Sequence, residues 1–280
     1  MELTSPKTLK ELLSKYETRP SKGLGQNFLI DKKVLKRIIE SADIKPNDII
    51  LEVGPGAGTL TQELARKAKK VIAVEKDRTM IEILKETLKD FNNVEVVQGD
   101  ILKLNLEHYT LNPYKIIANI PYYLTSPLIR KFLEEKNQPQ EMILMLQKEV
   151  AQRICAKPPQ MSLLAVSVQF YAEPKIISYV SKNCFWPPPK VDSAIIKIKP
   201  QINTEKKQID ADLFFKIVKA GFSQPRKQLA GNLSKILKID KEKTTAWLLK
   251  NNIKPNQRAE TLNVEDWIRL AKTGKVVIIT

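Results

Sequence analysis

The sequence predicts an α/β fold in which a mostly parallel sheet is covered by helices on both faces, followed by a small all-helical C-terminal domain. Three observations lead to this prediction. Short apolar runs alternate with amphipathic segments over residues 49–146, the pattern of parallel strands joined by helices. A polar segment follows at 201–207. Beyond it the chain has helical periodicity and becomes more basic.

The N-terminal part is predicted to hold a short helix over 8–17 and a basic loop, Arg19–Gly25, that contains proline and glycine. Asp31 is suited to cap the next amphipathic helix, because its carboxylate can accept hydrogen bonds from the first turn. The elements that follow are predicted at 49–53 (strand), 59–67 (helix), 71–75 (strand), 77–89 (helix), 94–98 (strand), 115–119 (strand), 126–135 (helix) and 142–146 (strand).

The last part of the sheet is harder to predict. Residues 161–171 fit a helix or a strand by periodicity, and their length favours a helix. Strands at 175–179 and 194–198, on either side of Pro187–Pro189, are suited to an antiparallel hairpin at the sheet edge. Four helices complete the chain, at 211–221, 225–236, 241–250 and 263–273. We place the domain boundary so that residues 1–202 form a catalytic domain and 203–280 a helical one.

The charge indicates an anionic partner. The chain has 47 Lys and Arg against 31 Asp and Glu, a net charge of +16. Nucleic acid is the usual partner of so basic a protein, and an anionic membrane surface is the alternative. Residues 201–280 hold 16 basic and 8 acidic residues, so half of the excess lies in the predicted helical domain. No run approaches the roughly 18 apolar residues of a membrane span, and no secretory signal is evident, so we expect a cytoplasmic protein.

Histidine and cysteine are scarce. His108 is the only histidine, and Cys155 and Cys184 form no CxxC pair. This composition argues against a metal site, a disulfide framework and a histidine acid–base relay. The sequence therefore predicts chemistry that needs neither imidazole nor a metal ion.

A glycine-rich turn, Glu52–Gly58, follows the first predicted strand and leads into a helix. Glycines allow a tight turn and close approach of a nucleoside-bearing ligand. Glu75 ends the second strand, where an acidic side chain can accept hydrogen bonds from ribose hydroxyls. These features fit either NAD or S-adenosylmethionine. The G-x-G-x-G spacing, and an acidic residue two places before Gly54, favour S-adenosylmethionine.

Asp100 follows the third strand at the same predicted sheet edge. Its carboxylate can accept a hydrogen bond from an adenine amine while Ile101 lies against the ring. The alternative is an aspartate that only stabilises a turn, which is common for this residue type.

The strip Asn119-Ile120-Pro121-Tyr122 directly follows the fourth strand. An aromatic amine is a poor nucleophile, because its lone pair is delocalised, and acceptors for its hydrogens make the nitrogen more tetrahedral. The Asn119 side-chain oxygen offers one acceptor. The Ile120 carbonyl offers another, since Pro121 holds the preceding residue extended. Tyr122 offers a face on which a base can stack. The strip predicts methyl transfer to an adenine amine by positioning and desolvation.

With these residues assembled, the chain resembles the small-subunit (16S) ribosomal RNA adenine dimethyltransferase family, also known as the kasugamycin-sensitivity methyltransferases, over essentially its whole length. The motifs that carry the resemblance are Gly25–Leu29, Glu52–Gly58, Asn119–Tyr122, Phe185–Ser193 and, more loosely, Phe222–Leu229 with Asn232-Leu233. In the last motif many members have a second basic residue where this chain has Pro225. Arg226 and Lys227 remain as candidates for phosphate contacts.

The resemblance implies a Rossmann-like S-adenosylmethionine methyltransferase domain and assigns roles to single residues. The residues implied to line the cofactor pocket are Asn27, Leu29, Gly54, Glu75, Asp100 and Asn119. Phe185 is implied to sandwich the target base opposite Tyr122, stiffened by the proline run behind it. The alternative for Phe185 is a core residue beside a rigid loop. Tyr123 is expected to be a packing residue.

The implied reaction is S-adenosylmethionine-dependent dimethylation of the N6 amine of two adjacent adenosines near the 3′ end of small-subunit rRNA, a step in ribosome biogenesis. The implied partner is that RNA within the small ribosomal subunit or its precursor, with no membrane, no metal, and a monomeric enzyme. Three alternatives stay open. They are a large-subunit rRNA adenine methyltransferase of the macrolide-resistance type, a non-catalytic RNA-binding assembly factor, and a nicotinamide dehydrogenase, which the absence of G-x-G-x-x-G disfavours.

Overall fold

The computed structural model describes residues 1–105, 113–201 and 209–279. His108 and residues 202–207 of the predicted boundary segment lie outside the described residues. The chain divides into two compact units. The first consists of Met1–Ala151 and Pro174–Pro200, and the second of Gln152–Glu173 and Gln201–Thr280.

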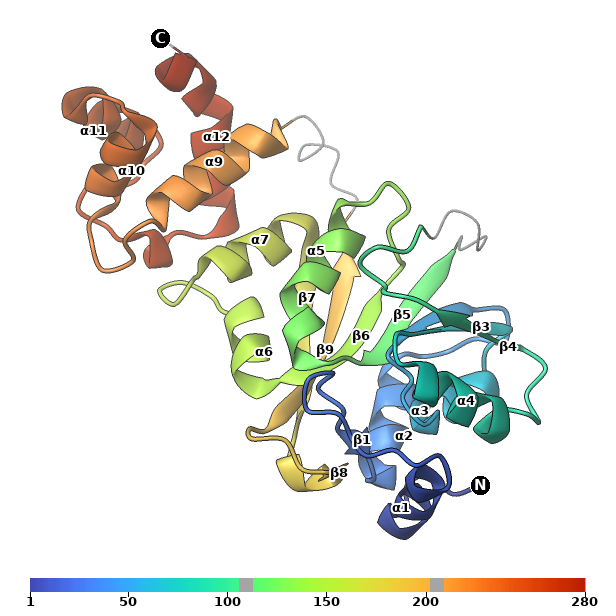
Figure 1. Ribbon diagram of the computed structural model, residues 1–280. Coiled ribbons are helices and arrows are strands. Elements are labelled where there is room, and N and C mark those ends of the chain that lie inside the picture. The colour runs from blue at the N-terminus through green and yellow to red at the C-terminus, as the bar shows by residue number, and fades with distance from the viewer. Residues whose placement is uncertain (106–112, 202–208, 280) are drawn as a thin grey trace. The chain divides into compact units, whose positions relative to one another are not determined.

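The first unit is built on a seven-stranded sheet in the order β4-β3-β2-β5-β6-β9-β7 (Figure 1). The strands are β2 (Ile49–Val53), β3 (Lys70–Glu75), β4 (Val94–Gln98), β5 (Tyr114–Asn119), β6 (Met142–Gln147), β7 (Ala172–Val180) and β9 (Ser193–Pro200). Strands β2 to β6 pair in parallel, and β9 runs antiparallel to β6. The two final strands lie side by side at one edge, where the sequence predicted them.

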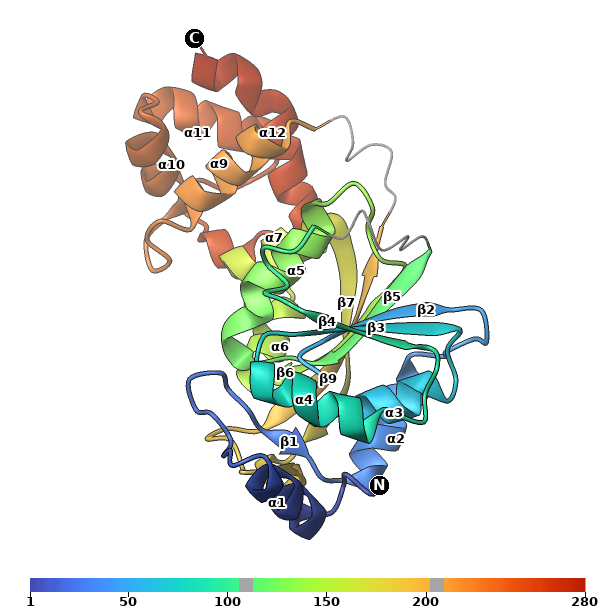
Figure 2. The ribbon, with the colours of Figure 1, turned by 45° about the vertical axis from the view of Figure 1, so that its right-hand side comes forward.

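Helices cover both faces of this sheet, as predicted (Figure 2). The helices are α2 (Lys32–Ser41), α3 (Thr59–Ala65), α4 (Arg78–Thr87) and α5 (Thr125–Glu134). Helices α3 and α4 connect β2 to β3 and β3 to β4, on one side of β2 in the sheet. Helix α5 connects β5 to β6, on the other side, so these crossovers run in opposite directions across the sheet. Right-handed crossovers therefore place α5 on the face opposite α3 and α4. Asp31 caps α2 as predicted, since its carboxylate accepts hydrogen bonds from Lys33 N at 2.8 Å and Val34 N at 3.0 Å.

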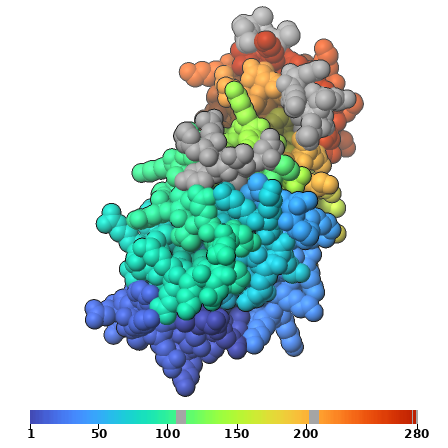
Figure 3. All heavy atoms as spheres, turned by 90° about the vertical axis from the view of Figure 1, so that its right-hand side faces the viewer, coloured from blue at the N-terminus to red at the C-terminus, as the bar shows by residue number. Residues whose placement is uncertain are grey.

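The N-terminal helix α1 (Pro6–Lys15) packs on α4. Figure 3 shows the N-terminal residues, in dark blue, below residues drawn in green on this face of the molecule. Leu9 and Leu12 share a buried cluster with Met80 and Ile83. The elements that were not predicted include the helix α6 (Lys148–Ile154) and the two-residue strands β1 (Phe28–Leu29) and β8 (Phe185–Trp186), which pair with each other.

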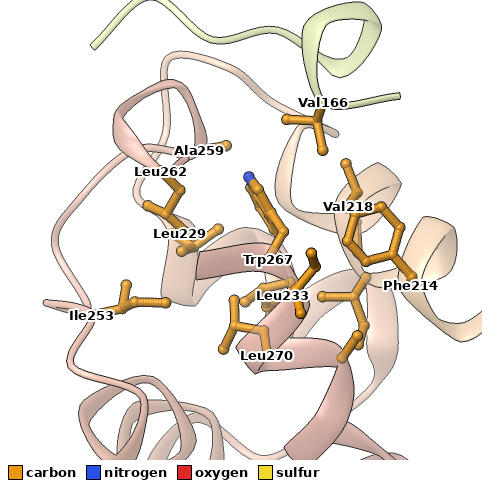
Figure 4. Close-up of a cluster of buried hydrophobic side chains, with 14 of the residues drawn as sticks. Val166, Phe214, Val218, Leu229, Leu233, Ile253, Ala259, Leu262, Trp267 and Leu270 are labelled. Carbon is orange, nitrogen blue, oxygen red and sulfur yellow. The ribbon is translucent and has the colours of Figure 1, made fainter. Parts of the chain in front are cut away.

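The second unit is a helical bundle. Its helices are α7 (Leu163–Tyr171), α9 (Ala211–Gly221), α10 (Leu229–Leu237), α11 (Lys241–Lys250) and α12 (Val264–Ile279). Trp267 is fully buried at the centre of this bundle, and Figure 4 shows Leu229, Leu233 and Leu270 around its ring. Residues 161–171 were predicted as a helix from their length, and this prediction is confirmed, because α7 is a helix.

Two predictions about this unit need correction. The predicted catalytic domain, residues 1–202, included 152–173, but this segment packs with the C-terminal helices. The reason is apolar contact: Phe170 stacks on Phe214 with ring centroids 4.1 Å apart. Helix α10 begins at Leu229 and not at Pro225. The Asn232 amide donates to the carbonyls of Gly221 and Gln224, at 2.7 and 3.0 Å, and holds the intervening turn outside the helix.

Candidate active site

The pocket of the first unit lies where the strand order reverses. Strand β2 has β3 on one side and β5 on the other, and the carboxyl ends of these strands open toward one cavity. Ligands of open α/β sheets bind at such a switch point. All ten residues singled out from the sequence line this one pocket: Asn27, Leu29, Gly54, Glu75, Asp100, Asn119, Ile120, Pro121, Tyr122 and Phe185. Their placement together is observed, and their individual roles stay predictions.

The glycine-rich turn after β2 needs glycine for its backbone. Gly54 has φ +68° and Gly56 has φ +57°, both in the left-handed region. A Cβ added to Gly54 would lie 3.3 Å from Cδ of Pro121. The glycine-rich turn and the Asn119–Tyr122 strip therefore lie so close together that a side chain at Gly54 would be crowded.

Glu75 is held rigidly at the end of β3. Its carboxylate accepts hydrogen bonds from the backbone N–H groups of Gly56 at 3.1 Å, Lys76 at 2.8 Å and Asp77 at 2.9 Å. Burial nevertheless raises the pKa of Glu75. A carboxylate has about four acceptor positions, so three backbone bonds leave it able to accept one more hydrogen bond from a ligand hydroxyl.

The position of Asp100 suits both roles considered from the sequence. Its Oδ1 accepts a hydrogen bond from Leu102 N at 3.0 Å, which stabilises a turn. Its Oδ2 lies 3.0 Å from the Lys76 ammonium, whose hydrogen bond holds the pKa of Asp100 below its usual value. The same carboxylate lines the pocket. A turn aspartate and a pocket acceptor are therefore compatible here.

Glu52 was noted in the sequence only as an acid before the glycines, and it was not predicted as a site residue. Its side chain is 1% exposed and lines the pocket wall. Among the described residues, Oε2 of Glu52 has no hydrogen-bond partner. Burial, with a smaller effect of the Glu75 charge, raises the pKa of Glu52 to about 8. The signal that could have identified it is a carboxylate within an otherwise apolar strand.

The Asn119 side chain is oriented by Asn27, in the N-terminal segment just before β1. Its Nδ2 donates to the backbone carbonyl of Asn27 at 3.2 Å, and the Asn27 amide donates in turn to the Gly25 carbonyl at 3.1 Å. Because a carbonyl only accepts, the Asn119 nitrogen must face Asn27. The Asn119 Oδ1 is thereby left as the acceptor for a substrate. The sequence indicated this residue but not its partner.

The rest of the Asn119–Tyr122 strip is anchored at both ends. Ile120 N donates to the Met145 carbonyl of β6 at 3.3 Å. Over the described residues, no hydrogen bond to the Ile120 carbonyl is found, whereas the carbonyl of Tyr122 accepts from Thr125 Oγ1 at 3.0 Å. The Tyr122 hydroxyl lies 2.8 Å from Ser193 Oγ, and burial raises its pKa, so the phenol stays neutral. This bond fixes the ring that borders the pocket.

Phe185 is placed by a strand pair that the sequence did not predict. Strand β8 pairs antiparallel with β1, so that Phe185 lies opposite Leu29 and Trp186 opposite Phe28. The Phe185 side chain is 3% exposed and lines the pocket. It is therefore both a buried residue and a pocket residue. Two-residue strands give no periodicity, which is why sequence analysis missed them.

Tyr123 differs from its predicted packing role. Its side chain is 52% exposed, and it lines the same pocket. Tyr122–Leu124 form a 3-10 turn, in which successive side chains point about 120° apart. Since Tyr122 is fixed by Ser193, Tyr123 is directed elsewhere, toward solvent.

The second unit contains a basic groove of its own. Its lining has four basic side chains, those of Arg226, Lys227, Lys235 and Arg258, and no acidic one. The polar residues that complete the lining are Gln224, Gln228, Asn232 and Asn256, with Gly231. Pro225, in the turn before α10, is exposed and is absent from the groove lining.

Within the described ranges, no group of three potential His, Cys, Asp or Glu ligands is found, and no helix is long and apolar enough to cross a membrane. Among the described residues, Cys155 and Cys184 form no disulfide.

The sheet order, the glycine turn, the acids at the carboxyl ends of β2 and β3 and after β4, and the Asn-Ile-Pro-Tyr strip define a methyltransferase with a nucleoside cofactor. Residues 17–275 match the family described as ribosomal RNA adenine dimethylase. The chain therefore belongs to this family. It is an rRNA adenine dimethyltransferase and uses S-adenosylmethionine.

Named relatives agree with this assignment. The chain is 44% identical to ribosomal RNA small subunit methyltransferase A of Alkaliphilus metalliredigens, with 96% of this chain and 97% of that protein covered. It is 45% identical to the protein of the same name in Dehalococcoides mccartyi strain CBDB1, covering 93% and 90%.

Two solved structures share the fold over most of their length. A dimethyladenosine transferase from Plasmodium falciparum has a TM-score of 0.72 at 29% identity, covering 86% of this chain and 94% of that one. The 23S rRNA methyltransferase ErmE has a TM-score of 0.70 at 27% identity, covering 88% and 98%.

Proposed function

We propose that this enzyme dimethylates the N6 amines of two adjacent adenosines near the 3′ end of small-subunit rRNA, within the small ribosomal subunit or its precursor. The relatives at 44% and 45% identity are named for the small subunit. The 23S rRNA methyltransferase ErmE is similar at 27% identity, so the large-subunit alternative has less support. The structural observation that carries the proposal is the orientation of the Asn119 amide.

The pocket fits S-adenosylmethionine on the chemistry of its hydrogen-bond acceptors. Glu75 keeps an acceptor position for a ribose hydroxyl, and Asp100 with the buried Ile101 offers an acceptor and an apolar surface for adenine. The unpartnered Oε2 of Glu52 suits one of the positive groups of the cofactor. When bound, S-adenosylmethionine supplies an electrophilic methyl group. Gly54, Asn27 and Leu29 complete the predicted cofactor wall.

Asn119 and Ile120 provide the acceptors for the target amine. The Asn119 Oδ1 accepts one amine hydrogen and the Ile120 carbonyl accepts the other, which draws the nitrogen lone pair out of the purine ring. A singly methylated amine has one hydrogen left, and either acceptor can still orient it. Tyr122 and Phe185 are the proposed aromatic walls on the two faces of the base. The chain needs only to position and desolvate the amine.

The basic groove of the second unit is proposed to bind the RNA backbone. Its four basic side chains without an acidic neighbour suit phosphate contacts, and such contacts make binding salt-dependent. We further propose that the enzyme acts as a monomer, without a metal, in the cytoplasm, where ribosomal subunits are assembled. These proposals follow from the family resemblance and the charge distribution.

The test is methyl transfer from labelled S-adenosylmethionine to small and large subunits that lack the modification, followed by identification of the labelled nucleoside. We expect dimethyladenosine in the small subunit only. Label in the large subunit alone would favour the macrolide-resistance type of reaction. A wild-type protein that binds small subunits without transferring label would indicate an assembly factor. The Asn119→Ala variant should lose at least about 100-fold in kcat, the scale of one lost transition-state hydrogen bond.

A further inference from the structure

Tyr123 is an exposed aromatic residue of the pocket that the proposed mechanism leaves without a role. Of the aromatic side chains that line the pocket, Phe185 is 3% exposed and Phe28 is 6% exposed, whereas Tyr123 is 52% exposed. What distinguishes Tyr123 from other exposed aromatic residues, such as Tyr179 at 51%, is that it lines the pocket. An exposed aromatic ring at this place offers a face on which a base can stack.

The backbone keeps Tyr123 at the rim of the pocket. Leu124 N donates to the Pro121 carbonyl at 2.9 Å, which closes the 3-10 turn that carries Tyr123. Gly25 lies close to the same turn: a Cβ added at Gly25 would be 3.9 Å from Cδ1 of Tyr123 and 3.4 Å from Cβ of Pro121. The ring is therefore attached to rigid elements and does not depend on a loose surface loop.

The charges beside Tyr123 suit a nucleic acid strand. Lys76, which also lines the pocket, is exposed, and its ammonium is bound to Asp100 within the pocket. The arm that leads to Gly25 carries the exposed side chains of Arg19 and Lys22. An exposed aromatic ring with basic side chains on its own pocket and on the adjoining segment is a combination that binds single-stranded nucleic acid, where bases stack and phosphates pair with the cations.

We propose that Tyr123 stacks on the nucleotide next to the adenosine that occupies the pocket. Turning one base into the pocket removes a stacking partner from its neighbour, and an exposed aromatic ring at the rim replaces that partner. Tyr122 and Tyr123, on successive residues of one turn, then contact successive bases. This inference rests on the proposed function, under which the neighbour of each target is the other target adenosine.

The experiment compares Tyr123→Ala and Tyr123→Phe with the wild type on under-methylated small subunits. Tyr179→Ala is the matched control, because Tyr179 is 51% exposed, lies on β7 in the same unit and does not line the pocket. The measurements are kcat, the KM for subunits, the Kd for S-adenosylmethionine by calorimetry, and the fraction of RNA with only one of the two adenosines modified.

Loss of one stacked base should raise the KM for subunits about 5- to 150-fold in Tyr123→Ala. The Kd for S-adenosylmethionine should stay unchanged, Tyr123→Phe should restore the KM, and RNA with one modified adenosine should accumulate. Tyr179→Ala should behave as the wild type.

The inference is overturned if Tyr123→Ala keeps the wild-type KM, if Tyr179→Ala shows the same loss, or if the Kd for S-adenosylmethionine rises in parallel with the KM, which would indicate a structural role. A wild type that leaves small subunits unmodified would refute the proposed function and this inference together. An active wild type with an unaffected Tyr123→Ala variant would refute the inference alone.

Discussion

Replacing the buried carboxyl group of Glu52 should change how the stability of this protein depends on pH. Glu52 is 1% exposed, and its Oε2 has no hydrogen-bond partner among the described residues. Burial raises its pKa from 4.5 to about 8. Glutamine has nearly the same shape and no charge, so Glu52→Gln removes the titration with little change in packing.

The direction in which the free energy of unfolding changes with pH depends on whether the folded or the unfolded state keeps the Glu52 proton. Between pH 4.5 and about 8 the folded protein keeps the Glu52 proton, whereas the unfolded chain releases it. The free energy of unfolding is therefore lowered as pH rises through this range. A pKa difference of roughly 3.5, at about 1.4 kcal/mol for each unit, corresponds to about 5 kcal/mol above pH 8.

The assay is urea denaturation of the cofactor-free protein at several pH values from 4.5 to 8.5. The difference in unfolding free energy between Glu52→Gln and the wild type should shift in favour of the variant by about 4 kcal/mol over this range, since part of the full effect lies outside it. Glu149→Gln, at an exposed position of α6, is the control for the loss of a carboxyl group that is not buried. A constant difference for Glu52→Gln would refute the reasoning, because it would mean that the carboxyl group ionises normally in the folded state.

Three further predictions concern the turn, the sheet and the second unit. Gly54→Ala should lower the free energy of unfolding by about 1–2 kcal/mol and weaken S-adenosylmethionine binding in calorimetry, because alanine is strained at φ +68°; unchanged values would contradict this. Lys115→Met should lower the unfolding free energy by about 3–5 kcal/mol in urea, because the buried ammonium of Lys115 lies 3.0 Å from Asp48 and 3.3 Å from Glu141. A loss below 1 kcal/mol would indicate that water solvates Asp48 and Glu141 in place of the Lys115 ammonium. Replacing Arg226 and Lys227 together by Gln should reduce the slope of log RNA affinity against log salt by about 2. An unchanged slope would exclude both from phosphate contact.

The fold could be predicted in detail because its signals are local. Apolar runs such as Ile49–Val53 and Met142–Gln147 are short and bounded, so strands buried on both faces were identified with nearly correct ends. The failures have equally physical causes. Residues 152–173 were assigned to the wrong unit because apolar periodicity does not say which core a helix joins, and here Phe170 stacks on Phe214. Helix α10 was predicted too early because the contacts of Asn232 with Gly221 and Gln224 are tertiary.

The sequence by itself indicated the part of the pocket formed by Gly54, Glu75, Asp100 and Asn119–Tyr122, since parallel strands bring their carboxyl ends to one edge and the motifs lie at those ends. Asn27, Leu29 and Phe185 were indicated by the family resemblance. Only the tertiary structure decided how these residues are set. Asn27 turns the Asn119 amide, Ser193 fixes Tyr122, and the pairing of β1 with β8 positions Phe185. Burial likewise made Glu52 a weak acid and left Tyr123 in solvent. Orientation and burial depend on partners 70 or more positions away in the chain, and no local pattern encodes such contacts.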